Sequence, residues 1–131
     1  MVLTMSIKAK DKMKKLEEIP VLNESASLKK CLDLMSIKSL GIACFVGESG
    51  ELKGLLTDGD LRRLLLTKQS PLPALLVSDG LSFGNSNPTT AHMDDEISKL
   101  QAIMNQKQIW DLPIVDSNNK LIGLLHRHDA N

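Results

Sequence analysis

The chain has 131 residues, of which 42% are hydrophobic and 24% charged, and its sixteen basic and sixteen acidic side chains give a formal net charge of zero. This length suits one globular domain or two small halves that depend on each other. The zero net charge and an aromatic content of only 2% argue against nucleic-acid binding, which uses cationic and stacking side chains.

Neither a membrane segment nor a signal peptide is indicated. No apolar run approaches the ~20 residues that a membrane span needs, and the first residues lack the basic flank and long apolar stretch of a secretory signal. Cys31 falls on the apolar face of a predicted helix and Cys44 inside a predicted strand, so both are expected to be buried free thiols. Free thiols suit a reducing compartment, and we expect a cytoplasmic protein.

The first half of the chain predicts a strand followed by a helix. After a loosely ordered lead-in at residues 1–10, a short strand is expected at residues 20–22. The helix that follows is capped by Ser25 or Ser27 and has an apolar stripe with a period of 3.6 residues, and Gly41 is predicted to end it.

A hairpin is predicted next. The continuous apolar run at residues 42–46 is typical of a strand that is buried on both faces. A turn at residues 47–50 and a returning strand at residues 52–56 complete the hairpin.

The returning strand is predicted to stop where a helix begins, within residues 54–63. Thr57 and Asp58 are both natural N-cap residues, and Asp60 would lie in the first helical turn, where a carboxylate suits the helix dipole. This pattern fits plain helix capping. It equally fits a site that presents backbone N–H groups and short polar side chains at one place.

The second half has the same order of elements. A Pro-containing connector at residues 70–73 ends the helix and leads to a loop at residues 80–88, where we place the boundary between units at residues 11–78 and 79–131. Beyond it we expect a strand at 89–91, a helix with an apolar stripe starting at Ile97, and strands at 110–115 and 121–125.

The two halves are an internal repeat. Gly123-Leu124-Leu125 repeats Gly54-Leu55-Leu56 at an offset of 69 residues (123 − 54), and the register holds without a gap over the preceding unit. The matched pairs include Leu28 and Ile97, Met35 and Met104, Val46 and Val115, and Leu52 and Leu121. Two copies of one supersecondary unit predict a pair related by pseudo-twofold symmetry.

Each unit has the order strand, helix, strand, strand, helix and closes on a Gly-apolar-apolar-Thr/Ser-x-x-Asp pattern, and this resembles a CBS domain. The chain as a whole resembles a tandem CBS pair (Bateman module), and in particular the C-terminal CBS pair of arabinose-5-phosphate isomerases, here without the isomerase domain. The resemblance is carried by Asp11-Lys12-Met13, Glu18-Ile19-Pro20, Ala26-Ser27-Leu28, Leu40-Gly41, Thr57-Asp58-Gly59-Asp60-Leu61-Arg62-Arg63 and Gly123-Leu124-Leu125-His126-x-His128-Asp129.

The resemblance implies an α+β fold in which two βαββα units pack with pseudo-twofold symmetry. The second unit would lack its last helix, because the chain stops at Asn131. A motif similar to residues 57–63 also occurs in CBS pairs attached to sugar nucleotidyltransferases, so the parent enzyme is left open between the two families.

A nucleotide site is also implied. In CBS pairs the Thr/Ser of the motif meets ligand phosphate and the Asp takes the ribose hydroxyls, which by position assigns Thr57 and Asp60, together with Asp58, to the first half-site. An ionised carboxylate can accept two hydrogen bonds from a vicinal diol, and a hydroxyl at a helix N-terminus lies where phosphate is stabilised. The residues at the strand starts would flank the base: Ile42, Ala43, Leu112 and Pro113.

The second half-site departs from the family pattern, because His126 replaces Thr/Ser while Asp129 is retained. The ribose contact is kept, whereas phosphate could be met only by His126 as a donor or by Arg127 as an ionic partner. At most one well-formed nucleotide site is therefore expected. His126, His128 and Asp129 could also be considered metal ligands, but no fourth ligand is evident and we predict no metal site.

Two further features have open interpretations. The basic pair Arg62-Arg63 is either a solvated helix face or an anion contact beside Thr57. Trp110 stands where the first unit has Gly41, and we interpret it as a packing or dimer contact, with stacking on a base as the alternative.

No catalytic set is evident, and we predict a non-catalytic regulatory module. It would bind AMP, ADP, ATP or a sugar nucleotide, need no cofactor, and modulate an attached or partner enzyme of sugar-phosphate metabolism, either a sugar isomerase or a nucleotidyltransferase. A homodimer is implied by the resemblance. The alternatives are a ligand-free structural or dimerisation module, or a fragment of a sugar isomerase or nucleotidyltransferase.

Overall fold

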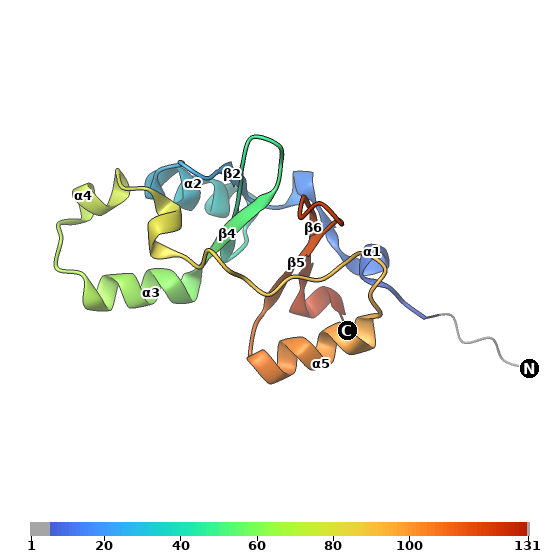
Figure 1. Ribbon diagram of the computed structural model, residues 1–131. Helices are drawn as coiled ribbons and strands as arrows, with labels where there is room; N and C mark the ends of the chain where they lie inside the picture. The colour runs from blue at the N-terminus through green and yellow to red at the C-terminus, as the bar shows by residue number, and fades with distance from the viewer. Residues whose placement is uncertain (1–5, 131) are drawn as a thin grey trace, which may run out of the picture.

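The computed structural model describes residues 6–130, so residues 1–5 of the lead-in and Asn131 lie outside the described part. Each unit centres on an antiparallel hairpin, β3 (Ile42–Val46) with β4 (Leu52–Thr57) in the first and β5 (Asp111–Val115) with β6 (Leu121–His126) in the second. The two hairpins stand side by side at the middle of the molecule, with the helices of each unit on its own flank (Figure 1).

The internal repeat is confirmed by strand register and helix bounds. Ile42 pairs with Thr57 in the first hairpin and Asp111 with His126 in the second, and both hairpins carry an irregularity at the same place. Helices α2 (Leu28–Lys38) and α5 (Ile97–Lys107) start at residues 28 and 97 and end at 38 and 107, an offset of 69 each time.

Reciprocal hydrogen bonds between the hairpin turns show the pseudo-twofold relation directly. The N–H of Leu52 donates to the carbonyl of Asn119 at 2.9 Å, and the N–H of Leu121 donates to the carbonyl of Gly50 at 3.1 Å. Gly50 and Asn119 have positive φ values of 84° and 62°, the left-handed conformation that glycine and asparagine adopt most readily.

The ends of α2 follow from local chemistry, and one prediction about them is wrong. Ser27 caps the helix by accepting a hydrogen bond from the N–H of Lys30 at 3.3 Å, as expected for an N-cap serine. Gly41 does not terminate the helix: Ser39 does, with φ of 56° and its N–H directed back to the carbonyls of the last turn. Gln108 has the same role after α5.

Each sheet is extended by a segment from the N-terminal part of the other unit. The short strand β1 (Lys14–Lys15) pairs antiparallel with β6 of the second unit. In the first unit, the N–H of Asn85 donates to the carbonyl of Leu55 at 2.8 Å and the reverse bond is 2.9 Å. The helix α1 (Ala9–Lys12) also packs with the second unit, because Ala9 is fully buried in that unit's core.

Two glycines permit these crossings. A Cβ at Gly54 would lie 2.6 Å from the carbonyl oxygen of Asn85, and one at Gly123 would lie 2.7 Å from the carbonyl oxygen of Lys14. Such distances are shorter than real Cβ contacts, so the crossing backbones need a residue without a side chain at both positions.

The strand that opens each unit is short. β2 (Val21–Asn23) runs parallel to β3. The strand predicted at residues 89–91 is reduced to a single bridge between Ala91 and Ile114, held by two backbone hydrogen bonds.

The remaining elements lie at the edges of the two units. α3 (Asp58–Thr67) continues from β4, and its counterpart in the second unit is the 3-10 turn η3 (Arg127–Ala130). The connector contains α4 (Leu72–Leu76) and η2 (Gly80–Phe83), and η1 (Leu16–Glu18) precedes β2. No helix in the described part of the chain is long and apolar enough to cross a membrane.

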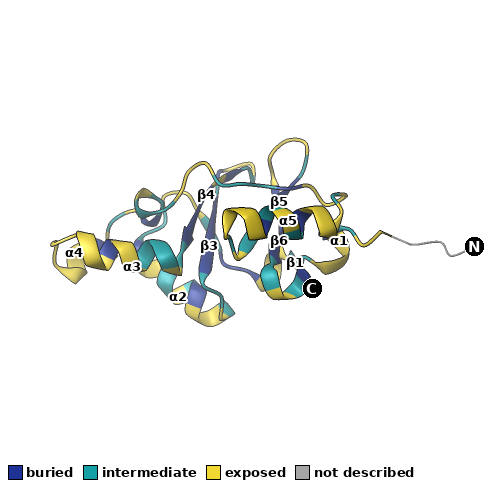
Figure 2. Ribbon diagram, turned by 90° about the horizontal axis from the view of Figure 1, so that it is seen from below, coloured by how far each residue is buried: buried dark blue, intermediate teal, exposed yellow. Residues whose placement is uncertain are grey.

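Three apolar clusters hold the fold together. One belongs to the first unit and one mainly to the second, whereas the third joins Ile42 and Leu55 of the first unit to Val115 and Leu124 of the second. Buried residues are concentrated in the strands (Figure 2). Cys31 and Cys44 are both buried free thiols, as predicted. Because the central cluster draws on both units, the units depend on each other for their burial.

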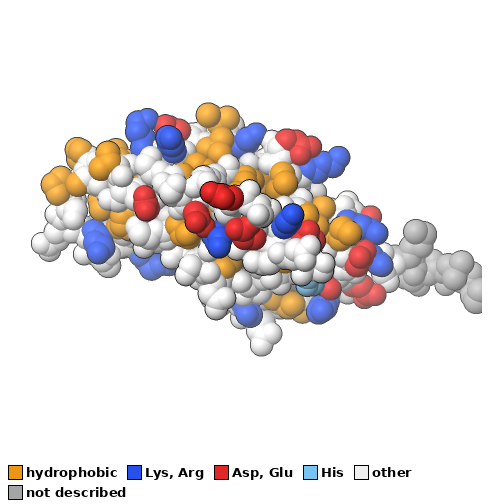
Figure 3. Space-filling model, turned by 45° about the horizontal axis from the view of Figure 1, so that its top comes forward, with side chains coloured by type: hydrophobic (Ala, Val, Ile, Leu, Met, Phe, Trp, Pro, Cys, Tyr) orange, Lys and Arg blue, Asp and Glu red, His pale blue; other side chains and the backbone are white. Residues whose placement is uncertain are grey.

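Acidic and basic side chains are interspersed on the face shown in Figure 3, in keeping with the zero net charge. Apolar side chains gather on that face at the end formed by α4 (Figure 3), where Leu72 and Val77 are exposed.

Candidate functional site

An open cleft of about 710 Å³ lies between the two units. Its first wall is formed by the start of β3 and the N-terminal turn of α3, and its second by the C-terminal end of α5, the start of β5 and the end of β6. Connector residues Asn85, Pro88 and Thr89 complete the lining. This volume falls within the roughly 300–1,000 Å³ of sites for small organic ligands.

The first wall is organised by a reciprocal capping box at the start of α3. The N–H of Asp60 donates to Thr57 Oγ1 at 3.2 Å, and the N–H of Thr57 donates to Asp60 Oδ2 at 3.0 Å. Arg63 Nη2 lies 2.5 Å from Asp60 Oδ1, so both carboxylate oxygens have partners. Both Thr57 and Asp60 line the cleft, so helix capping and a place in the candidate site are combined in the same side chains.

Asp58 lies beside them because Gly41 has no side chain. The N–H of Asp58 donates to the carbonyl of Gly41 at 3.0 Å, and its carboxylate occupies the space that a Cβ on Gly41 would need. The glycine that we predicted as a helix terminator therefore makes room for an acidic group of the cleft wall.

The second wall carries an Asp–His pair. His126 Nδ1 lies 2.7 Å from Asp111 Oδ1, and the two residues face each other across the strands at the positions that Ile42 and Thr57 hold in the first unit. Only 11% of the Asp111 side chain is exposed. Burial raises the pKa of Asp111, and the hydrogen bond and charge of His126, with a smaller effect of Lys14, oppose that rise.

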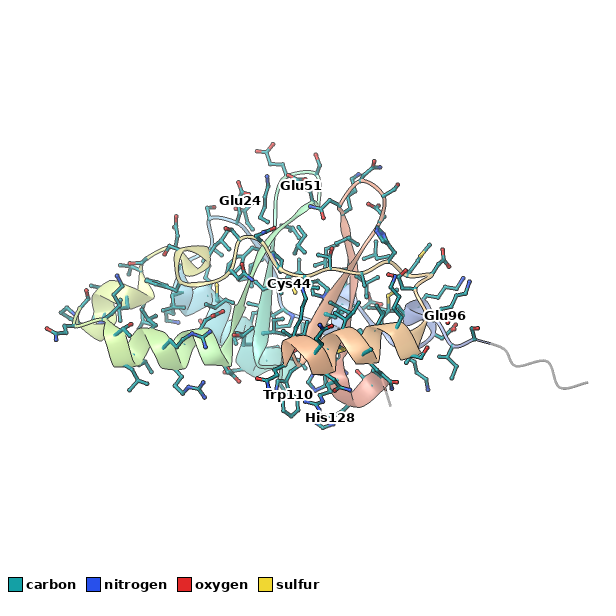
Figure 4. The ribbon with its side chains drawn as sticks, turned by 60° about the horizontal axis from the view of Figure 1, so that its bottom comes forward. Glu24, Cys44, Glu51, Glu96, Trp110 and His128 are labelled. Carbon is teal, nitrogen blue, oxygen red and sulfur yellow. The ribbon has the colours of Figure 1, made fainter. Side chains whose placement is uncertain are left out.

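Trp110 stands at the edge of the same wall and is 53% exposed. The guanidinium carbon of Arg127 lies 4.9 Å from the centre of the Trp110 ring, and the His128 ring meets it edge-on at 5.7 Å. Trp110 and His128 project together at the end of the second sheet (Figure 4). The backbone N–H of Arg127 donates to the Trp110 carbonyl at 2.7 Å, the counterpart of the Asp58–Gly41 bond.

The cleft brings together five of the ten predicted site residues: Ile42, Thr57, Asp58, Asp60 and His126. The other five do not line it. Ala43, Leu112 and Pro113 are buried within their strands, Arg127 lies over Trp110, and Asp129 Oδ2 lies 3.3 Å from Lys14 Nζ.

Sequence reasoning missed Asp111 altogether, although a signal was available. The 69-residue register places it opposite His126, and an acidic residue at the start of an otherwise apolar strand run is unusual. Within residues 6–130, no group of three or more His, Cys, Asp or Glu side chains is arranged to hold a metal ion.

The sequence matches the CBS domain family at residues 9–67 and again at residues 80–130. Because the two matches cover most of the chain and follow the repeat described above, the protein belongs to the CBS domain family and is a tandem CBS pair.

Relatives with similar sequences are longer proteins. The chain is 33% identical over 118 residues to a probable arabinose 5-phosphate isomerase of Haemophilus influenzae, covering 90% of this chain and 33% of that protein. It is 35% identical over 123 residues to an uncharacterised protein of Helicobacter pylori, covering 93% and 36%. The chain thus spans about a third of the length of these relatives.

Solved CBS pairs have the same fold. The CBS-pair protein CBSX2 in complex with AMP aligns with a TM-score of 0.82 at 21% identity, covering 94% of this chain and 92% of that one. The CBS domain pair of MJ0100, in complex with 5′-methylthioadenosine and S-adenosylmethionine, aligns with a TM-score of 0.81 at 19% identity, covering 95% and 93%.

Proposed function

We propose that this CBS pair binds an adenosine-type or sugar nucleotide in the cleft and thereby modulates an attached or partner enzyme. The observation that carries the proposal is the N-terminal turn of the ten-residue helix α3, with Thr57 and Asp60, opening into a cleft of nucleotide size. CBSX2 with AMP and MJ0100 with two adenosine compounds support the choice of ligand class.

The chemistry of the first wall suits a sugar phosphate. The positive end of the α3 dipole favours a phosphate near Thr57. Arg62 and Arg63 line the same wall and can pair with phosphate oxygens. Asp60 can accept hydrogen bonds from ribose hydroxyls once Arg63 turns from the carboxylate to the phosphate.

A ligand in this cleft would contact both units, which gives a route to regulation. A nucleotide that binds one arrangement of the units more tightly than another shifts the population toward that arrangement. The resemblance to a probable arabinose 5-phosphate isomerase supports an enzyme of sugar-phosphate metabolism as the regulated partner. The buried free thiols are consistent with a cytoplasmic location.

The test is a thermal-shift and calorimetric panel of AMP, ADP, ATP, S-adenosylmethionine and CMP-Kdo. A ligand at 100 times its Kd stabilises the fold by about 2.7 kcal/mol, and this corresponds to a Tm shift on the order of 10 °C for a domain of this size. We expect one nucleotide to give such a shift and Asp60→Ala to abolish it.

Ser27→Ala provides a matched control, because it also removes a helix cap but lies outside the cleft. Both variants should lose about 1 kcal/mol of stability, whereas only Asp60→Ala should lose the ligand response. An Asp60→Ala protein that binds nucleotide normally, or a panel without any shift, would contradict the proposal.

The second candidate is a ligand-free dimerisation module, favoured by exposed apolar side chains. Leu65 and Leu66 on α3 and Ile37 on α2 are 64%, 79% and 74% exposed. Sedimentation of the natural chain and of Leu66→Lys tests this function. A dimer that is lost in the variant, together with no Tm shift for any compound of the ligand panel, would establish dimerisation in place of nucleotide binding.

A further inference from the structure

Trp110 is unusual for its place in the molecule. It is the single tryptophan of a chain that is poor in aromatic residues, and about half of its surface is exposed at the edge of the cleft. A tryptophan buried in a core would be stabilised by transfer from water, whereas this one leaves much of its apolar ring in solvent. The exposed ring is therefore available to a ligand.

The ring is also held in a fixed orientation by its neighbours. Arg127 covers it from one side, and the position of Arg127 is set by the backbone bond to the Trp110 carbonyl and by a bond from Arg127 Nη2 to Asn105 Oδ1 at 3.4 Å. His128 adds an edge contact. Trp110 lines the cleft while Arg127 and His128 do not. The guanidinium that lies over the ring is thus outside the cleft lining, whereas the half-exposed Trp110 itself lines the cleft.

A ring fixed in this way is a good stacking surface. A cation on one face holds the indole in place, so little side-chain freedom is left to lose when a planar group binds to the other face. The adjacent Asp111–His126 pair can meet the polar edge of such a group, because Asp111 Oδ2 and His126 Nε2 are not used in the bond between them.

The first wall offers no comparable surface. At the corresponding position it has Gly41 with the carboxylate of Asp58 over it. The helix terminus and the two arginines lie on that wall. The two walls therefore differ in kind: the first has charged groups of both signs, which suit the phosphate and hydroxyls of a sugar phosphate, and the second suits a flat ring.

We propose that Trp110 is the base-stacking platform of the cleft, so that a nucleoside phosphate binds with its base on the second unit and its phosphate at the start of α3. This inference rests on the proposed function and adds the orientation of the ligand and the residue that selects for a planar base. It assigns to Trp110 the stacking role that the sequence offered as the alternative to a packing or dimer contact.

The experiment compares AMP with ribose 5-phosphate, which has the same sugar phosphate without a base, by calorimetry on the natural chain, Trp110→Ala and Trp110→Phe. Stacking on an aromatic side chain is strong enough that Trp110→Ala should weaken AMP binding by roughly 10- to 100-fold. Trp110→Phe should weaken it less, and the affinity for ribose 5-phosphate should be the same in all three proteins.

Fluorescence gives an independent readout, since Trp110 is the only tryptophan. AMP should quench its emission in the natural chain, and ribose 5-phosphate should leave it unchanged. Trp110→Ala with undiminished AMP affinity would overturn the stacking inference while leaving the proposed function intact. Equal weakening of AMP and ribose 5-phosphate, or a change of oligomeric state without a change of affinity, would overturn it as well. If no nucleotide binds the natural chain, both the proposed function and this inference are wrong.

Discussion

The two hairpins share strand register and the place of their irregularity, yet the side chains at their cleft ends differ. The first has Ile42 opposite Thr57, an apolar residue and a helix cap, whereas the second has Asp111 opposite His126, a pair of ionisable groups. The repeat thus keeps its backbone geometry, whereas its side chains diverge where the strands reach the cleft. The result is a cleft with two chemically different walls.

The surroundings of the last aspartate of the CBS motif, Asp60 in the first unit and Asp129 in the second, differ as well. Asp60 lies in the cleft wall, bonded to the start of its own helix. Asp129 lies outside the cleft wall and faces Lys14, which comes from the N-terminal part of the first unit. The first half-site is therefore open to a ligand, whereas the second has an internal cation beside its carboxylate.

The largest expected effect tests whether the two cores are equivalent. Leu56 and Leu125 hold corresponding positions in the repeat, and both are completely buried in the core of their own unit. Each Leu→Ala change should cost about 2–5 kcal/mol of unfolding free energy, measured by urea denaturation. Both variants should unfold in a single transition, because the central cluster joins the units.

Two separate transitions, or a cost below 1 kcal/mol for only one of the variants, would contradict the equivalence of the units. Leu66→Ala is the control, since this exposed leucine should change stability by less than ~0.5 kcal/mol.

A smaller effect tests the divergent pair itself. His126→Thr gives the second wall the residue that the first has at this position, but it leaves the largely buried Asp111 without its partner. We expect a loss of about 1–3 kcal/mol. The double change Asp111→Ile with His126→Thr reproduces the residue pair of the first hairpin and should recover most of that loss. The unfolding free energies of the natural chain, both single variants and the double variant, measured in urea, form the double-mutant cycle that tests this. Additive effects of the two changes would show that Asp111 and His126 do not support each other.

At alkaline pH, stability should depend on the buried thiols of the first unit, where both cysteines lie. Burial, with a smaller effect of Asp111, raises the pKa of Cys44 from 9.0 to about 12. The unfolded chain therefore loses this proton first, so the unfolding free energy falls as pH rises from 9 toward 12, by about 1 kcal/mol over the first unit of pH.

Cys44→Ala removes this titration. The difference in unfolding free energy between the natural chain and the variant should be constant below pH 9 and should shrink above it. A difference that stays constant up to pH 10.5 would show that the thiol does not titrate as its burial requires.

The smallest effect concerns the internal cation of the second half-site. Lys14→Met removes the partly exposed ion pair with Asp129 and should cost only about 0.2–1 kcal/mol, decreasing as salt is added. If the ion pair closes the second half-site, the variant should also bind a second nucleotide, with lower affinity, as measured by calorimetry. A loss above 2 kcal/mol would instead show that Lys14 is essential to the sheet edge.

The sequence was most informative where local chemistry and the repeat act together. The apolar patterns, repeated at an offset of 69 residues, predicted both hairpins and the helices α2 and α5. Thr57 and Asp58 were the predicted N-cap candidates of α3, and Thr57 is the one that caps it. Gly41 was misinterpreted because the reason for a glycine there is the packing of Asp58, which lies seventeen positions later (58 − 41). No local pattern indicates a contact of that kind.

Long-range pairing was also beyond the sequence. The pairing of β1 with β6 joins residues about 110 positions apart, and Lys14 and Lys15 have no alternation that marks a strand. The residues predicted from the helix cap, Thr57, Asp58 and Asp60, line the cleft, whereas the cross-strand partner Asp111 was missed. For Trp110 the sequence left a packing or dimer contact and stacking on a base as alternatives.

A crystal structure with AMP bound would test the central claim most directly, namely that the two unlike walls hold one nucleotide in one orientation. The predicted result is a single AMP in the cleft, with its phosphate at the start of α3 near Thr57, its ribose hydroxyls on Asp60 and its base against Trp110. AMP bound in the reverse orientation, or beside Asp129 with the cleft unoccupied, would contradict it.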